Sequence, residues 1–283
     1  MTWNVVARKE FEDTIRSRWL IALSVLFALL IGAAVYVTSL IFGGSGATLS
    51  STRVLRAFPI KDGIVTTLLP LVALVVSYNA VVGERETGSL KLLLALPHAR
   101  SDVVVGKVAG RAAALAVALV AGFALPGLVF LLSGTFTLEA VAYVQYVFFV
   151  VLLAAAFVSV GVGVSAAVDS NRLAIAAAVA IYLVFVALLG AVQGSLGLFS
   201  AFVGWPEWIP LTVQQTTRVL QLLNPAGAFK FVINGTLGSG LFLETNSSSG
   251  VGPRLQLSGL LMLLAWVVVP PLLGLIRFEE TDL

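Results

Sequence analysis

The densest group of charged residues lies in the polar stretch Val82-Gly83-Glu84-Arg85-Glu86-Thr87-Gly88-Ser89-Leu90, which continues through Pro97-His98-Ala99-Arg100 to Gly106-Lys107. Carboxylate and guanidinium groups so close together can form ion pairs and charge-assisted hydrogen bonds with another protein. The stretch separates two long apolar segments in a chain that otherwise largely excludes charge. We therefore expect a soluble partner to bind here.

Motifs for catalysis and nucleotide binding are absent from the sequence. The only histidine is His98 and there is no cysteine, so neither a His-Glu-x-x-His zinc site nor a thiolate metal site can form. The only Gly-Lys pair, Gly106-Lys107, has Ser101 where a phosphate-binding loop needs its first glycine and Val108 where it needs Ser or Thr. We expect this chain to have no catalytic residue, no metal site and no bound cofactor.

The composition predicts an all-α membrane protein that forms a single domain over residues 1–283. Hydrophobic residues make up 59% of the chain and charged residues 11%, whereas soluble domains carry about 25% charged residues. A spanning helix needs about 20 apolar residues, and the charge-free runs predict six of them. We expect the spans at 19–41, 63–83, 107–132, 141–168, 173–197 and 255–276.

Residues 2–18 are predicted to form an amphipathic helix on the membrane surface. Trp3, Ala7, Phe11 and Ile15 form one apolar stripe, and most charged side chains lie off it. Six spans place both termini on one side, which holds eleven of the 17 Lys and Arg residues. The positive-inside rule makes that side the cytoplasm. Topology thus explains the basic residues and the net charge of +3, so we expect no nucleic-acid binding.

The other side of the membrane holds one long segment, 198–254. A short helix is predicted over Leu211–Leu223, and the glycine- and serine-rich parts at 235–240 and 245–252 are flexible by composition. Asn234 and Asn246 match the glycosylation acceptor pattern, which occurs often by chance.

Ionisable residues are not evident in the predicted spans, where ion-driven carriers usually keep them. Energy for any uphill transport is therefore expected from another subunit. The polar residues within spans are candidates for lining a pathway, although interhelical hydrogen bonds explain them equally well. They are Ser159, Ser165, Tyr182 and Gln193.

A short helix is predicted over residues 84–96 of the polar stretch. Gly83 permits a break after the second span, and acidic residues complement the start of a helix. Leu90, Leu93 and Leu94 share one apolar face, and Pro97 ends the helix. Such a helix suits a groove in a partner protein. The pattern alone leaves open that it rests on lipid instead.

This stretch resembles the cytoplasmic segment of ABC type-2 transporter permeases, especially the NosY-like branch. The shared pattern is Gly-Glu-Arg-Glu-x-Gly-Ser-Leu-x-x-Leu-Leu-x-x-Pro-x-x-Arg followed by Gly-Lys, with Ser89 where Thr is commoner. The opening Ala7-Arg8-Lys9-Glu10-Phe11 resembles the elbow helix of the family. The ending Arg277-Phe278-Glu279-Glu280-Thr281-Asp282-Leu283 resembles its usual tail.

The resemblance implies the permease subunit of an ATP-driven exporter in the cell membrane. Two permease chains, expected to be a homodimer, would alternate access as two separate ATPase subunits bind and hydrolyse ATP with magnesium. A self-contained secondary carrier or channel is the alternative. The outer segment 198–254 would carry short re-entrant helices and meet an extracytoplasmic partner. The resemblance assigns coupling to the ATPase to Gly83, Glu84, Arg85, Glu86, Gly88, Ser89, Leu90, Leu93, Leu94, Pro97 and Arg100.

Overall fold

The computed structural model describes residues 3–42, 49–56, 59–90, 99–132, 136–206, 208–239 and 252–280. Within these ranges, six helical segments are long and apolar enough to cross a membrane, so the predicted all-α fold with six spans is confirmed. Each predicted span lies inside or within a few residues of one of them. The segments are Leu20–Thr38, Gly63–Glu86, Arg100–Leu132, Ala140–Ala167, Asn171–Phe202 and Pro253–Glu279.

The first half of the chain holds the first two spans and several short elements. These are α1 (Trp3–Ile15), α2 (Arg18–Phe42), β1 (Leu49–Ser50), α3 (Ser51–Arg56), the π-helical stretch η2 (Pro59–Leu68), α4 (Leu69–Ser77) and α5 (Val82–Glu86). The second half holds α7 (Arg100–Leu132), β2 (Phe136–Thr137), α8 (Ala140–Ala167), α9 (Asn171–Tyr182), the π-helical stretch η3 (Leu183–Leu188), α10 (Leu189–Phe202), α11 (Val213–Leu223), α12 (Pro225–Ser239) and α13 (Pro253–Glu279).

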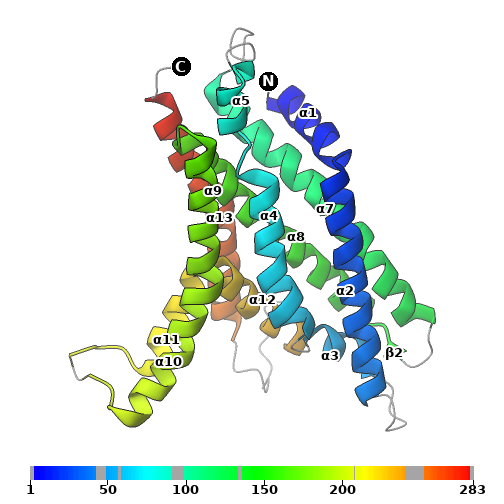
Figure 1. Cartoon of the computed structure of the whole chain (residues 1–283). Coiled ribbons are helices and arrows are strands. Elements are labelled where there is room, and N and C mark those ends of the chain that lie inside the picture. Colours follow the sequence, from blue (N-terminus) through cyan, green and yellow to red (C-terminus); the bar gives the residue numbers. More distant parts are fainter. Residues whose placement is uncertain are drawn as a thin grey trace.

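The helices form one bundle in which α1, α5 and the C-terminal end of α13 lie together at one end, the upper end in Figure 1. The opposite end carries β2 and the C-terminal end of α10. There β1 and β2 pair in parallel over two residues each, with Leu49 opposite Phe136. An even number of spans requires the two ends of the chain to lie on the same side, and the arrangement in Figure 1 agrees with it.

Helix α8 forms the centre of the bundle, because it packs against α4, α7, α12 and α13. Two glycines bring α8 and α13 into backbone contact. A Cβ atom on Gly163 would lie 2.3 Å from the carbonyl oxygen of Pro270, and one on Gly274 would lie 2.2 Å from that of Gly163. Small residues allow spanning helices to pack this closely. Aromatic rings fill the adjacent core, where Tyr146 lies edge-on to Phe229 and Phe123.

The fifth span, formed by α9, η3 and α10, runs along one edge of the bundle (Figure 1). In the apolar 18-residue stretch that identifies this helix as a span, no residue is buried, whereas 67% of the corresponding stretch of α8 is buried. Gly190, Gly194 and Gly197 have no neighbouring side-chain or backbone atoms within 4 Å of an added Cβ atom. This span therefore presents most of its surface to its surroundings.

The described part of the outer segment contains the helices α11 and α12. The predicted helix at Leu211–Leu223 is confirmed as α11, which begins with a reciprocal capping box between Thr212 and Gln215. The predicted flexibility at 235–240 is wrong up to Ser239, because α12 continues through it. Gly235 instead provides space, since an added Cβ atom would lie 2.1 Å from Nε2 of Gln256. Asn234 thus lies within a helix, and Asn246 is outside the described residues.

Helix α1 packs against the first half of α7, and its buried face differs from the predicted stripe. Val6 and Glu10 are buried, whereas Trp3 is 43% exposed. The reason lies in α7, where Gly106 and Gly110 form the surface on which α1 rests. A Cβ atom added to Gly106 would lie 2.6 Å from Cβ of Val6. A Cβ atom added to Gly110 would lie 2.4 Å from the carbonyl oxygen of Ala7. Two glycines four residues apart remove the side chains that would hold α1 away.

Gly110→Ala is expected to destabilise the protein by about 1–3 kcal/mol, because the new methyl group overlaps the backbone of α1. Gly122→Ala on the same helix is the matched control, since its Cβ atom would meet Phe27 at an ordinary 3.6 Å. Alanine also favours the helix by about 1 kcal/mol at both positions. Chemical unfolding in detergent micelles compares them. Equal stability of the two variants would contradict this account of the α1–α7 contact.

Candidate functional site

The charged stretch begins with a tight turn held by a side chain from α8. After α4 ends, residues 78–81 turn the chain and α5 follows. The Ser165 hydroxyl accepts hydrogen bonds from the backbone N–H groups of Val81, at 3.0 Å, and Val82, at 3.1 Å. These are groups that the start of a helix leaves without partners. A Cβ atom on Gly83 would lie 2.3 Å from Oδ1 of Asn79, so a side chain here would require the Asn79 side chain to move.

Glu84 points toward α1 and α7. Its carboxylate lies 2.9 Å from Nζ of Lys107 and 3.3 Å from Nζ of Lys9. Lys107 is fully buried and also contacts Glu10 at 2.6 Å. Arg111 completes the group, with Nε 2.8 Å from Glu10. We call these five residues, Lys9, Glu10, Glu84, Lys107 and Arg111, the α1–α7 charge network.

The α1–α7 charge network is stable only because its charges compensate one another. Burial by itself would raise the pKa of Glu10, but the neighbouring Arg111 and Lys107 outweigh burial and hold the pKa below its usual value of 4.5. Glu10 is therefore ionised at neutral pH. Arg111 is further fixed by donating to the carbonyl oxygen of Val76 at 2.7 Å. The network thus ties α1, α4, α5 and α7 together at one end of the bundle.

Arg85 points the other way, toward the ends of α8 and α13. It donates hydrogen bonds to the carbonyl oxygen of Val168 at 2.9 Å and to the carboxylate of Asp169 at 3.0 Å. Its guanidinium carbon also lies 5.5 Å from the centre of the Phe278 ring, within the range of a cation–π contact. Arg85 therefore links α5 to the turn after α8 and to the last turns of α13.

Glu86 links α5 to the start of the fifth span. Its carboxylate accepts a hydrogen bond from the backbone N–H of Asn171 at 2.7 Å. Asn171 is the first residue of α9, where the helix dipole favours negative charge. Ser170 caps the same helix end by accepting from the N–H of Leu173 at 3.4 Å. Unlike Glu84, Glu86 is exposed.

Arg100 begins α7 and caps the far end of the chain's last helix. It donates hydrogen bonds to the carbonyl oxygens of Phe278 and Glu279. The final carbonyl groups of a helix lack partners within the helix, and a basic side chain is favourable there. Arg100 also lies 5.1 Å from the centre of the Phe278 ring. Arg85 and Arg100 thus both hold the end of α13.

The structure corrects the predicted helix at 84–96. Helix α5 ends at Glu86, and Gly88 follows with a φ of 75°, a conformation that favours glycine and interrupts the helix. Leu90 is fully buried in the core, so it is not free to form the docking face predicted for it. Leu93, Leu94 and Pro97 lie outside the described residues. Ser89 is exposed, with its hydroxyl 2.9 Å from that of Thr87.

The four candidate pathway residues do not form one site. Ser159 and Ser165 are buried within α8, and Ser165 is occupied by the turn before α5. The Ser159 hydroxyl has no hydrogen-bond partner within the described part of the chain. Tyr182 and Gln193 lie on the fifth span, at the edge of the bundle. None of the four lines the cavity between α1, α2 and α4 or the narrow cavity between α2, α4 and α7.

Several partners of the charged stretch were not predicted as site residues, among them Glu10, Asp169 and Phe278. Each lies more than 70 residues from its partner in the sequence, so local patterns do not reveal the pairing. The sequence held one indication that Glu10 is paired: it lies four residues after Val6, on the same face of the predicted helix. A charge in that position is buried only when a partner compensates it.

Comparison with known proteins agrees with the resemblance of the charged stretch to ABC type-2 transporter permeases. Residues 4–283 match the model of a family described as "ABC-2 family transporter protein". The chain belongs to this family and is a permease subunit of an ABC transporter. It is a multi-pass integral membrane protein, as its six apolar helices also indicate.

Two relatives carry the name "Probable ABC transporter permease protein NosY". The protein from Stutzerimonas stutzeri is 32% identical over 286 residues, which cover 98% of each chain. The protein from Pseudomonas aeruginosa is 40% identical over 124 residues, covering 44% of this chain and 43% of the relative. The similarity to the Stutzerimonas stutzeri protein covers nearly the whole chain, including the charged stretch and the outer segment.

Proposed function

We propose that two copies of this chain form the membrane-spanning part of an ATP-driven exporter in the cell membrane. Two separate cytoplasmic ATPase subunits would bind at the α5 end of the bundle and supply ATP and magnesium. The observation that carries this proposal is the set of contacts made by Glu84, Arg85 and Glu86. Through them the short helix α5 is attached to α1 and α7, to α8 and α13, and to α9.

These contacts provide a physical route for coupling. Closure of an ATPase pair would press on the α5 end of each copy. Ion pairs and hydrogen bonds would then carry the displacement to five other helices at once, so the helices would move together. This arrangement suits alternation between inward-facing and outward-facing states. The exposed residues Glu86, Thr87 and Ser89 are the part of this stretch available to a partner among the described residues.

The charged end of the bundle is proposed to face the cytoplasm. Eleven of the 17 Lys and Arg residues lie on this side in the predicted topology, and basic residues are enriched on cytoplasmic sides. Helix α1 would then lie at the inner membrane surface as an elbow helix. Its basic residue Arg8, with a side chain that is 81% exposed, would reach the lipid headgroups.

The fifth span is the proposed contact with the second copy. Its apolar stretch is unburied, and Gly190, Gly194 and Gly197 leave room for a helix to approach closely. Gln193 lies on this span and is only partly buried, so it would line the space between two copies, whereas Tyr182 packs against the core of the bundle. The outer helices α11 and α12 follow the span directly and would cap that space. Their exposed surface is where an extracytoplasmic partner would bind.

A self-contained carrier or channel is the alternative function. Membership of an ABC transporter family argues against it. The only Asp, Glu, Lys or Arg residues within the predicted spans, Lys107 and Arg111, lie in the first turns of the third span, where they pair with Glu84 and Glu10.

Co-purification tests the proposal. We expect a neighbouring gene to encode the ATPase subunit, and we expect the full chain expressed with that subunit to purify as a complex that hydrolyses ATP. The chain expressed alone is expected to hydrolyse none. The proposal fails if no ATPase subunit associates, or if reconstituted chain alone transports a solute along an ion gradient.

A further inference from the structure

A cavity of about 600 Å³ lies between α1, the start of α2 and the end of α4. Its size falls within the range of about 300–1,000 Å³ typical of small-molecule sites. It is separate from the exposed residues of α5 that we propose to contact the ATPase. Its lining changes character from one end to the other. Asp13, Ser17, Asn79 and Arg111 contribute polar groups, while Leu20, Leu23, Val75 and Val76 contribute an apolar wall.

The position of this cavity matches the level of lipid headgroups. The first predicted span begins at residue 19, so Leu20 and Leu23 lie in its first turns, and Asp13 and Ser17 precede it. Tyr78 also lines the cavity, close to the end of the second span, and tyrosine is enriched at the membrane interface. Val75 is 51% exposed, so the apolar side of the cavity opens toward the bilayer.

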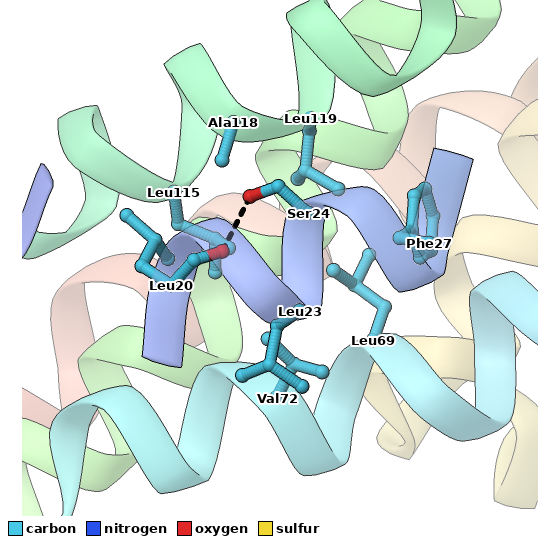
Figure 2. Close-up of a pocket in the computed structure, with 9 residues that line it drawn as sticks. All are labelled: Leu20, Leu23, Ser24, Phe27, Leu69, Val72, Leu115, Ala118 and Leu119. Carbon is cyan, nitrogen blue, oxygen red and sulfur yellow. Dashed lines mark hydrogen bonds between the residues drawn. The ribbon is translucent and has the colours of Figure 1, made fainter. Parts of the chain in front are cut away.

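Leu20 and Leu23, at the apolar end, also line a second and much smaller cavity. Figure 2 shows the narrow cavity beyond them, which is lined by residues of α2, α4 and α7. Its volume is about 10 Å³, which leaves space for about one water molecule. Its only side-chain hydroxyl, that of Ser24, donates to the carbonyl oxygen of Leu20 at 2.6 Å. A ligand headgroup must therefore stay in the larger cavity, with its acyl chains leaving past Val75.

The polar end offers one charge of each sign to a ligand. Asp13 is exposed and has no ion-pair or hydrogen-bond partner within the described ranges. Arg111 uses Nε for Glu10 and Nη1 for Val76, which leaves Nη2 without a hydrogen bond to any described residue. The other two lining carboxylates, Glu10 and Glu84, are already paired with the lysines of the α1–α7 charge network. An anionic headgroup without a cation would leave Asp13 uncompensated.

We propose that this cavity binds one zwitterionic phospholipid with a primary ammonium headgroup, of the phosphatidylethanolamine type. The ammonium group donates hydrogen bonds to the carboxylate of Asp13, and the phosphate accepts from Nη2 of Arg111. The acyl chains lie along Leu20, Leu23 and Val75. A bound lipid fills the space beside the α1–α7 charge network and so supports the end of the bundle where α1, α4 and α7 meet. This inference requires only that the chain spans a membrane.

Native mass spectrometry of the full chain in detergent tests the site by titration with phosphatidylethanolamine, phosphatidylcholine and phosphatidylglycerol of the same acyl composition. We expect one molecule of phosphatidylethanolamine to bind most tightly, because a quaternary ammonium group cannot donate to Asp13. Asp13→Asn is expected to weaken this binding by about tenfold, as for loss of one charge-assisted hydrogen bond. Binding of phosphatidylcholine should change little, so the preference between the two lipids disappears.

Two further variants separate the site from a general effect on α1. Leu23→Trp fills the apolar wall and is expected to weaken binding of all three lipids. Glu12→Gln is the matched control, because Glu12 lies one residue from Asp13 but pairs with Arg8 and does not line the cavity. Its lipid binding should equal that of the unaltered chain. Equal affinity of the unaltered chain for the three lipids, or an unchanged preference in Asp13→Asn, would overturn the proposal.

Discussion

Lys107→Met is expected to destabilise the protein by about 3–5 kcal/mol, the usual cost of breaking a buried ion pair. Lys107 is fully buried and lies between the carboxylates of Glu10 and Glu84. Methionine has a similar length, so packing changes little and the loss of charge dominates. The substitution leaves two carboxylates with less compensation in a buried environment. Chemical unfolding of the detergent-solubilised chain measures the difference.

Arg8→Met provides the control for this prediction. It removes a cation at the same end of the bundle, on α1 and 3.0 Å from Glu12, but the Arg8 side chain is 81% exposed. An exposed pair contributes about 0–1 kcal/mol. If Lys107→Met costs no more than Arg8→Met, the α1–α7 charge network does not stabilise the bundle.

Glu86→Lys is expected to weaken the binding of the ATPase subunit at least about tenfold, which corresponds to about 1.4 kcal/mol. The substitution places a cation at the start of α9, where the helix dipole disfavours it, and removes the hydrogen bond to Asn171. Helix α5 then loses its link to the fifth span. Because Glu86 is exposed, the free energy of unfolding should change by only about 1 kcal/mol. Titration of the ATPase subunit onto the chain in nanodiscs measures the affinity.

Glu12→Lys changes the net charge equally and lies at the same end of the bundle, on α1. It makes no contact with α5, so we expect the ATPase subunit to bind it about as tightly as the unaltered chain. Equal affinities of Glu86→Lys and Glu12→Lys for the ATPase would mean that Glu86 is not part of the coupling surface.

The spans could be predicted from the sequence because charge excluded over about 20 residues is a strong and local signal. Residues such as Lys107 could not be placed in the same way. The residues around Gly106-Lys107 excluded a phosphate-binding loop, but they gave no reason to pair Lys107 with Glu10. The pairing depends on α1 folding back onto Gly106 and Gly110, a contact between segments about 100 residues apart.

The sequence predicted the charged stretch between the second and third spans, where the structure has it, but its local structure was only partly predictable. Helical spacing favoured one helix from Glu84 onward, with Leu90 on its outer face. Tertiary contacts override that preference, since Gly88 turns the chain and Leu90 enters the core. Ser165 shows the same limit. A hydroxyl within a span suggested either a pathway or a hydrogen bond, and only the fold places Val81 and Val82 beside it.

Binding of a separate ATPase subunit at the α5 end of this chain can be measured directly. The sequence contains no cysteine, so single cysteines at Ser89 and Thr137 can report on opposite ends of the bundle. Both side chains are exposed, and Figure 1 places β2, which holds Thr137, at the end away from α5. The measurement is the rate of maleimide labelling in nanodiscs with and without the ATPase subunit. We predict slower labelling at Ser89→Cys and no change at Thr137→Cys. Unchanged labelling at Ser89→Cys, or protection of Thr137→Cys instead, would contradict the account.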